Sequence, residues 1–273
     1  MHNFSVLMSI YNKEQPSFFD HALHSVYEQT YKSNEVVIVQ DGKLNQELYQ
    51  VIEKWRKKLP IKDVILEKNQ GLGIALNAGL NLCTNDLIIR VDTDDINKPD
   101  RFEIQYTYMK NNPNITVCGC HIAEFDKDPS DIKGYRCVPI GDEINSTINK
   151  RNPINHMTSC FRKEHILSVG GYQHLTYMED YYLWVRLYVK GFKLENLDKV
   201  LVLARTGKNM LNRRRGLIYF RSEIKMLIKL LKLNIENKYS TIIYFSIRAF
   251  IRLIPSSILS KIYSLLRKKQ IRL

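Results

Sequence analysis

Four short apolar runs alternate with helix-like segments in the first hundred residues of this 273-residue chain. The runs are FSVLMSI, EVVIV, DVIL and DLIIRV, and the segments between them place apolar residues at helical spacing. We expect helices from about Ser17 to Gln29, from about Gln46 to Lys58 and after Gly71. Strands joined by crossover helices form right-handed βαβ units and a parallel sheet. The sequence therefore predicts an α/β fold with a doubly wound sheet.

The middle of the chain is predicted to extend the same sheet. Here RFEIQYTYMKNN and EDYYLWVRLYVKG have helical patterns, whereas ITVCGCHIAEFD and KVLVLAR have the patterns of strands. Neither a repeat nor a low-complexity linker separates this region from the first. We therefore expect residues 1–97 and 98–205 to be two halves of one domain, with a helical extension over residues 206–273.

Polar side chains follow three of the four predicted strands. Tyr11 follows the first strand, Asp41 ends the second, and Asp92, Asp94 and Asp95 follow the fourth. In open α/β sheets, ligands bind outside the carboxyl ends of the strands, where the loops converge. The sequence therefore predicts a binding site at this edge of the sheet.

Three carboxylates lie within four residues at Asp92, Asp94 and Asp95. Carboxylates this close repel one another unless a cation lies between them, and Mg2+ and Mn2+ prefer such oxygen ligands. A metal site is one interpretation. A turn with helix-capping aspartates before Pro99 is the other.

A second acidic pair, Glu179 and Asp180, precedes a helix that contains Tyr181, Tyr182 and Trp184. Acidic residues at a helix start interact favourably with the helix dipole, which is a purely structural explanation. The functional interpretation is that one of them is a general base beside aromatic rings that pack on a sugar. Together with a metal site, this pair indicates chemistry on sugars.

The net charge of +13 is concentrated at the C-terminal end. Residues 205–273 contain 17 Lys and Arg and 2 Asp and Glu, whereas the preceding residues contain 24 and 26. Within this tail, Arg221, Lys225, Lys229 and Lys232 recur at helical spacing among Leu and Ile. Such basic amphipathic helices bind anionic membrane surfaces, and the many large aliphatic residues argue against nucleic acid. The alternative is that these helices pack on the body with their basic stripe in water.

The sequence gives no indication of export or of a disulfide framework. No apolar run reaches the roughly 18 residues of a spanning helix, and MHNFSVLMSIYNKEQ lacks a basic n-region. We expect a cytoplasmic protein, peripheral on the inner face of the cytoplasmic membrane. The five cysteines are an odd number, and we expect buried thiols.

The segments described above occur in the order found in the family 2 glycosyltransferases of the GT-A fold, which the chain resembles over about residues 3–205. The matching segments are SVLMSIYN, ALHSVYEQTY, EVVIVQDG, NQGLGIALNAGL, RVDTDDINKPDRFEIQ, NHMTSCFRKE, GGY and EDYYLWVRLYVKGFKLENLDKVLVLAR. Within that family the chain is most similar to bacterial enzymes that extend O-antigen or exopolysaccharide repeat units, the amylovoran-biosynthesis-like group.

The resemblance implies a role for individual residues. It places Tyr11, Asp41, Asn69 and Asp92 on the sugar nucleotide, Asp94 and Asp92 on Mn2+ or Mg2+, and Asp180, with Glu179 beside it, as the catalytic base. Contacts with the acceptor or with phosphates are expected from His156, Trp184, Arg213 and Arg214, and weaker candidates for a direct role are Arg101 and Glu103.

The implied function is that of an inverting, metal-dependent glycosyltransferase. It would move a hexose, galactose or glucose, from a UDP-sugar to a lipid-diphosphate-linked sugar, with a β-1,3 linkage to GlcNAc or GalNAc on undecaprenyl diphosphate as the specific expectation. The alternative is a non-catalytic polyanion- or membrane-binding protein that retains the fold. The joint presence of Asp92, Asp94 and Asp180 argues against this alternative.

Overall fold

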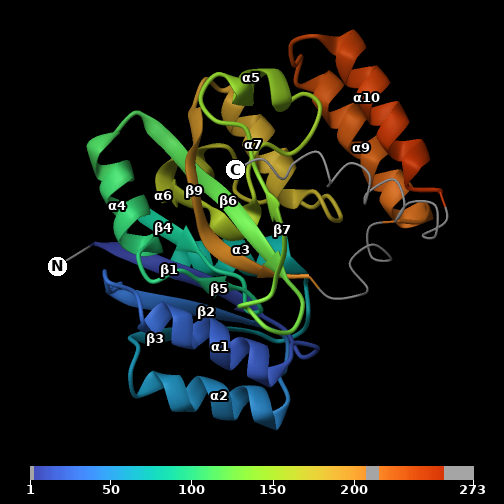
Figure 1. Ribbon diagram of the computed structural model, residues 1–273. Coiled ribbons are helices and arrows are strands. Elements are labelled where there is room, and N and C mark those ends of the chain that lie inside the picture. The colour runs from blue at the N-terminus through green and yellow to red at the C-terminus, as the bar shows by residue number, and fades with distance from the viewer. Residues whose placement is uncertain (1–2, 207–214, 255–273) are drawn as a thin grey trace.

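The computed structural model describes residues 3–206 and 215–254, which form one mixed sheet of nine strands covered by helices (Figure 1). The first half consists of β1 (Phe4–Ile10), α1 (Pro16–Tyr27), β2 (Glu35–Asp41), α2 (Gln46–Arg56), β3 (Ile61–Leu66), α3 (Leu72–Leu82) and β4 (Leu87–Arg90). These strands are parallel in the order β3-β2-β1-β4. The predicted α/β fold with alternating strands and helices is confirmed.

The second half continues the sheet. It consists of β5 (Ile96–Asn97), α4 (Arg101–Asn111), β6 (Ile115–Phe125), β7 (Ile132–Arg136), α5 (Glu143–Thr147), the 3-10 turn η1 (His156–Thr158), β8 (Cys160–Arg162), α6 (Lys163–Ser168), α7 (Glu179–Val189) and β9 (Lys193–Arg205). Strand β8 pairs antiparallel with both β4 and β6, and β9 runs parallel to β6. Strand β7 was not predicted, because it lies in a segment rich in Asp, Pro and Gly.

The side chains of the sheet alternate between two apolar cores. Phe4, Val6 and Met8 pack on the face covered by α1 and α2, whereas Leu7 packs on the face covered by α3 and α7. Helix α3 lies close to the sheet at Gly79, where an added Cβ would lie 2.4 Å from Leu7 Cδ1. The sheet is thus buried on both faces, and the site must lie at its edges.

The helices α9 (Leu217–Lys232) and α10 (Lys238–Ile251) pack on the body. Met226 of α9 and Phe245 of α10 are fully buried, and Phe245 stacks on Tyr181 of α7 with 6.1 Å between ring centroids. The fully buried Glu223 of α9 accepts hydrogen bonds from Arg248 of α10 and from Arg252, the residue that follows α10. One face of this helix pair therefore belongs to the folded body, as in the alternative considered for the basic tail. None of the described helices is both long and apolar enough to cross a membrane.

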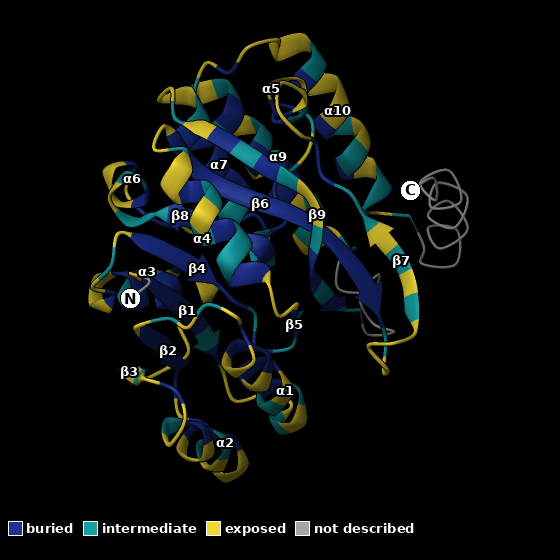
Figure 2. Cartoon of the chain, turned by 60° about the vertical axis from the view of Figure 1, so that its left-hand side comes forward, coloured by how far each residue is buried: buried dark blue, intermediate teal, exposed yellow. Residues whose placement is uncertain are grey.

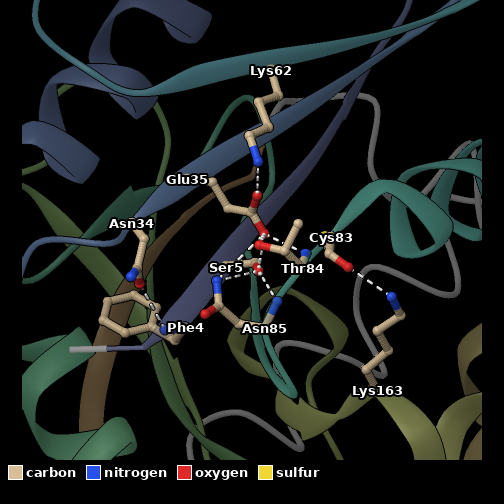
Figure 3. A network of polar contacts seen from close by, with 9 residues as sticks. All are labelled: Phe4, Ser5, Asn34, Glu35, Lys62, Cys83, Thr84, Asn85 and Lys163. Carbon is tan, nitrogen blue, oxygen red and sulfur yellow. Dashed lines mark hydrogen bonds and ion pairs between the residues drawn. The ribbon is translucent and has the colours of Figure 1, made fainter. Parts of the chain in front are cut away.

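A buried carboxylate joins the N-terminal ends of the first strands (Figure 3). Glu35 at the start of β2 is 1% exposed and receives hydrogen bonds from Ser5 Oγ of β1 and from the backbone N–H of Thr84, at 2.6 Å. Lys62 of β3 lies 2.6 Å from its Oε2. Burial alone would raise the pKa of Glu35, but these hydrogen bonds outweigh it and lower the pKa to about 2.

We predict that Glu35→Gln lowers the free energy of unfolding by about 2–3 kcal/mol at pH 7, because it removes a charge that three neighbours stabilise. The pKa of Glu35 is lower in the folded than in the unfolded chain. Its contribution is therefore complete above about pH 4.5 and is lost as the pH falls toward 2. Urea unfolding at several pH values should show the difference between wild type and variant shrinking with acid. This role would be contradicted if the difference in free energy of unfolding between wild type and Glu35→Gln did not change with pH. It would also be contradicted if that difference equalled the one caused by Glu67→Gln, at an exposed residue.

Candidate active site

Asp92, Asp94 and Asp95 lie in the loop after β4, with one carboxylate oxygen of each within 4.8 Å of the others. Asp95 is buried, and its Oδ1 accepts a hydrogen bond of 2.8 Å from the backbone N–H of Arg205 at the end of β9. Asp92 and Asp94 are half-buried. Burial, with the charges of Asp92 and Glu14, raises the pKa of Asp94 to about 7. A cation would relieve this excess of negative charge, and the all-oxygen donor set suits Mg2+ or Mn2+.

Arg90, the last residue of β4, is a cation that the folded chain places beside these acids. Its side chain is 4% exposed and forms an ion pair with Asp92. Its Nε and Nη1 have no hydrogen-bond partner among the described residues. Sequence reasoning missed this residue, although an arginine that ends an apolar strand was a visible signal.

Arg101 and Glu103 do not reach this site as functional groups. Arg101 is fully buried, and its guanidinium donates to Gln105 Oε1 and to the backbone oxygen of Arg90. It therefore supports the end of β4 from behind, and the expectation of a direct role is wrong. Glu103 accepts a hydrogen bond from Thr30 and lines a surface groove between α4 and β9.

Asp180 lies in the first turn of α7 and faces a cavity of about 670 Å3. Its Oδ2 accepts a 2.7 Å hydrogen bond from Asn152 Nδ2. Burial raises the pKa of Asp180 and raises the pKa of the neighbouring Glu179 to about 7. A carboxylate with a raised pKa is a better proton acceptor near neutral pH, which is the property a general base needs.

His156 and Trp184 have different positions relative to this cavity. His156 lines it, and His156 Nε2 lies 2.9 Å from the hydroxyl of Tyr172. Burial, reinforced by Arg90, lowers the pKa of His156 well below its usual value, so its ring is neutral. Trp184 is fully buried in the core under α7. It offers no face to a sugar, so the expectation of an acceptor contact is wrong.

The residues expected at the sugar nucleotide lie at the carboxyl ends of the four parallel strands: Tyr11 after β1, Asp41 at the end of β2, Asn69 after β3 and Asp92 after β4. Tyr11 is 43% exposed. Asp41 is buried, and its two carboxylate oxygens accept hydrogen bonds from the backbone N–H groups of Gln70, at 2.7 Å, and Gly71, at 3.0 Å. Asn69 Nδ2 donates to the backbone oxygen of Asp41 at 3.3 Å. Asp41 thus holds the loop that carries the exposed Asn69.

The remaining predicted residues, Arg213 and Arg214, lie outside the described residues. The cavity at Asp180 instead contains other arginines that the sequence did not single out. They come from β7, from the loop before Asn152, and from α10. The C-terminal helices therefore contribute to the same cavity as the candidate base.

The chain is similar to a family of known proteins over most of its length. The model of "Glycosyl transferase family 2" matches residues 5–220. The chain is 41% identical to the amylovoran biosynthesis glycosyltransferase AmsE of Erwinia amylovora, covering 97% of this chain and 99% of that protein. It is 42% identical to an Escherichia coli UDP-Gal:alpha-D-GlcNAc-diphosphoundecaprenol beta-1,3-galactosyltransferase, covering 98% and 96%.

Solved structures give the same fold at lower identity. TarS 1–349 of S. aureus in complex with UDP-GlcNAc matches with a TM-score of 0.70 and 20% identity, over 91% of this chain and 72% of that one. The mannosyltransferase PcManGT of Pyrobaculum calidifontis, in complex with GDP-Man and Mn2+, matches with a TM-score of 0.61 and 17% identity, over 96% and 79%. The GT-A fold expected from the resemblance is confirmed.

We predict that Asp41→Ala loosens the loop at residues 69–71, because two backbone N–H groups lose their acceptors. Hydrogen exchange at the amides of Gln70 and Gly71 should accelerate by about tenfold or more, as expected for the loss of a charged acceptor worth about 1.5–3 kcal/mol. Asp41→Asn retains one acceptor oxygen and should give a smaller effect. Unchanged protection of both amides in Asp41→Ala would contradict this role.

Proposed function

Because this chain belongs to glycosyltransferase family 2, we propose that it is an inverting enzyme that transfers galactose or glucose from a UDP-sugar to a sugar carried on a lipid diphosphate. The observation that carries the proposal is the separation of two acidic groups. Asp92 and Asp94 share a crowded turn after β4, whereas Asp180 lies in the first turn of α7 at a cavity large enough for a sugar acceptor.

The relatives support the proposed substrates. The Escherichia coli relative is named for UDP-Gal and for GlcNAc-diphosphoundecaprenol, and its similarity extends over nearly the whole of both chains. We therefore take a β-1,3 linkage to GlcNAc on undecaprenyl diphosphate as the specific reaction, with GalNAc as the second acceptor. Tyr11 and the loop at Asn69, which Asp41 holds, form the proposed nucleotide side of the site.

Asp92 and Asp94 are the residues that would hold Mn2+ or Mg2+. The bound ion would neutralise charge on the leaving diphosphate. Asp95 is buried and already bound to the backbone of Arg205, so we assign it to support of the turn. Arg90 holds Asp92 from the protein side and places positive charge near the departing phosphates.

The proposed reaction is a single in-line displacement. Asp180 accepts the proton of the acceptor hydroxyl while that oxygen forms a bond to the anomeric carbon of the donor. The bond from this carbon to the phosphate oxygen breaks, and UDP leaves with the electron pair. Asn152 orients the Asp180 carboxylate through its hydrogen bond. Attack opposite to the leaving group inverts the anomeric configuration.

We predict that Asp180→Asn lowers kcat by about a hundredfold or more, since general base catalysis typically contributes that much. UDP binding should remain within about twofold, because Asp180 does not contact the leaving group. Asp94→Asn should also lower kcat about a hundredfold or more, and should in addition weaken Mn2+ binding, measured by electron paramagnetic resonance of the free ion.

The matched control is Asp131→Asn, an exposed carboxylate at the end of the loop before β7 that pairs with Lys133. It should leave kcat and Mn2+ binding unchanged. Near-normal turnover of Asp180→Asn would remove Asp180 as the base, and Glu179→Gln would then be the variant to compare. Absence of both transfer and UDP binding in the wild type would favour the alternative of a non-catalytic polyanion- or membrane-binding protein.

We also propose that α9 and α10 bind the anionic inner face of the cytoplasmic membrane, which makes the enzyme a peripheral cytoplasmic protein. The outward face of α10 is apolar, with Tyr239 85%, Ile243 58%, Ile247 53% and Phe250 66% exposed. These residues follow helical spacing and hold no charge among them. Figure 2 shows exposed residues along this helix. The exposed face of α9 adds basic residues, namely Arg221, Lys225 and Lys232. Apolar insertion beside basic side chains is the chemistry of a helix at a membrane surface.

We predict that Ile243→Glu combined with Ile247→Glu abolishes flotation of the protein with vesicles of phosphatidylethanolamine containing about 25% phosphatidylglycerol. Wild type should float with these vesicles and less with neutral phosphatidylcholine vesicles. Because both side chains are exposed, we expect the variant to fold, and circular dichroism checks this. Equal flotation of wild type and variant would contradict the assignment of this face to the membrane.

A further inference from the structure

The cavity at Asp180 is strongly cationic. Four arginines line it, Arg136, Arg151, Arg248 and Arg252, and Asp180 is its one acidic lining residue within the described chain. Behind the cavity, the single carboxylate of Glu223 pairs with both Arg248 and Arg252. The lining itself therefore carries four guanidinium groups and one carboxylate. Such a cavity selects an anion.

We propose that Arg151 and Arg248 bind the diphosphate of the lipid-linked acceptor and thereby place its sugar at Asp180. This inference rests on the proposed function and adds the residues that recognise the acceptor. A diphosphate diester has two ionised oxygens, and guanidinium groups bind such oxygens through paired, charge-assisted hydrogen bonds.

The shape of the surface supports this assignment. A second groove, of about 290 Å3, lies beside the cavity and shares Arg151 and Arg248 with it. The groove is also lined by Tyr244 of α10, which is 46% exposed next to the apolar outward face of that helix. The surface therefore offers three adjacent places: Asp180 for a sugar, the two shared arginines for a diphosphate, and α10 for a lipid chain. These places have the same order as the three covalently linked parts of the acceptor.

The two shared arginines differ in how they are held. Arg248 donates from Nη1 to the backbone oxygen of Lys150 at 2.7 Å and from Nη2 to Glu223 at 3.0 Å, so its guanidinium is fixed in place. Arg151 is exposed, and its side chain forms no hydrogen bond or ion pair with another described residue. It is the sequence neighbour of Asn152, which donates to Asp180. Arg151 is thus available for a ligand close to the candidate base.

The donor diphosphate is the other anion that this cavity could receive. The residues proposed for the donor, Tyr11, Asn69, Asp92 and Asp94, are absent from the cavity lining. The donor phosphates would bind near the carboxylates proposed to hold a metal ion. The cavity at Asp180 is lined by arginines and not by those carboxylates. The acceptor diphosphate is therefore the occupant that the arrangement favours.

The test is Arg151→Glu, because the Arg151 side chain has no hydrogen-bond or ion-pair partner among the described residues whose loss would unfold the protein. Transfer is measured to a GlcNAc-diphosphate-lipid and to an alkyl glycoside of GlcNAc that has no phosphate. We expect the KM for the diphosphate acceptor to rise by about tenfold or more, with the KM for the UDP-sugar and the rate on the glycoside within about twofold. The matched control is Lys57→Glu, the same charge change at an exposed lysine after α2. It should leave both KM values and the rate on the glycoside unchanged.

Binding of radiolabelled geranyl diphosphate, measured by equilibrium dialysis without donor, tests the same site independently of turnover. Wild type should bind it, Arg151→Glu should bind it about tenfold more weakly, and UDP should not compete. Two results of the transfer assay would overturn the inference: an equal loss of transfer to both acceptors, or a rise in the KM for the UDP-sugar. Two results of the binding assay would also overturn it: displacement of geranyl diphosphate by UDP, or equal binding by wild type and Arg151→Glu. A wild type that binds the probe but transfers no sugar would instead contradict the proposed function alone.

Discussion

The confinement of three carboxylates at the end of β4 is the constraint on which the rest of the site depends. Asp95 is satisfied by the backbone of Arg205, which ties the turn to the end of β9, and Asp92 is held by the buried Arg90. Arg101 in turn supports the backbone of Arg90. The fold therefore supplies enough positive charge to hold the turn in place and leaves Asp94 with a raised pKa. This is the electrostatic condition under which a divalent cation binds well.

The C-terminal helices join the catalytic body to the proposed membrane surface. The inner face of α10 stacks Phe245 on Tyr181, the residue after Asp180, and places Arg248 at the cavity. Its outer face is apolar and exposed. One helix thus touches the region of the candidate base on one side and would meet lipid on the other. An acceptor whose sugar and lipid are joined by a diphosphate has the same three-part arrangement.

The parallel half of the sheet was predictable for two reasons. Each strand is a short apolar run, and in each helix between them the apolar residues recur at helical spacing. The acidic turn was predictable because its residues are contiguous. Trp184 was misassigned because an aromatic residue near Asp180 in sequence can point either to the cavity or to the core, and helical position alone did not decide this. Strand β7 lacks a strong apolar pattern. Arg248 could not be connected to Asp180, since residues far apart in sequence are joined only by tertiary packing.

The most direct test of the central claim is the structure of the product formed from UDP-galactose and a GlcNAc-diphosphate-lipid by the purified protein with Mn2+. The anomeric configuration of the transferred sugar, read from proton NMR coupling, reports the geometry of the displacement. The account predicts a β-linked galactose, inverted from the α-configured donor, and product formation by Asp180→Asn that is slower by about a hundredfold or more. An α-linked product, or an equally active Asp180→Asn, would contradict a single displacement with Asp180 as the base.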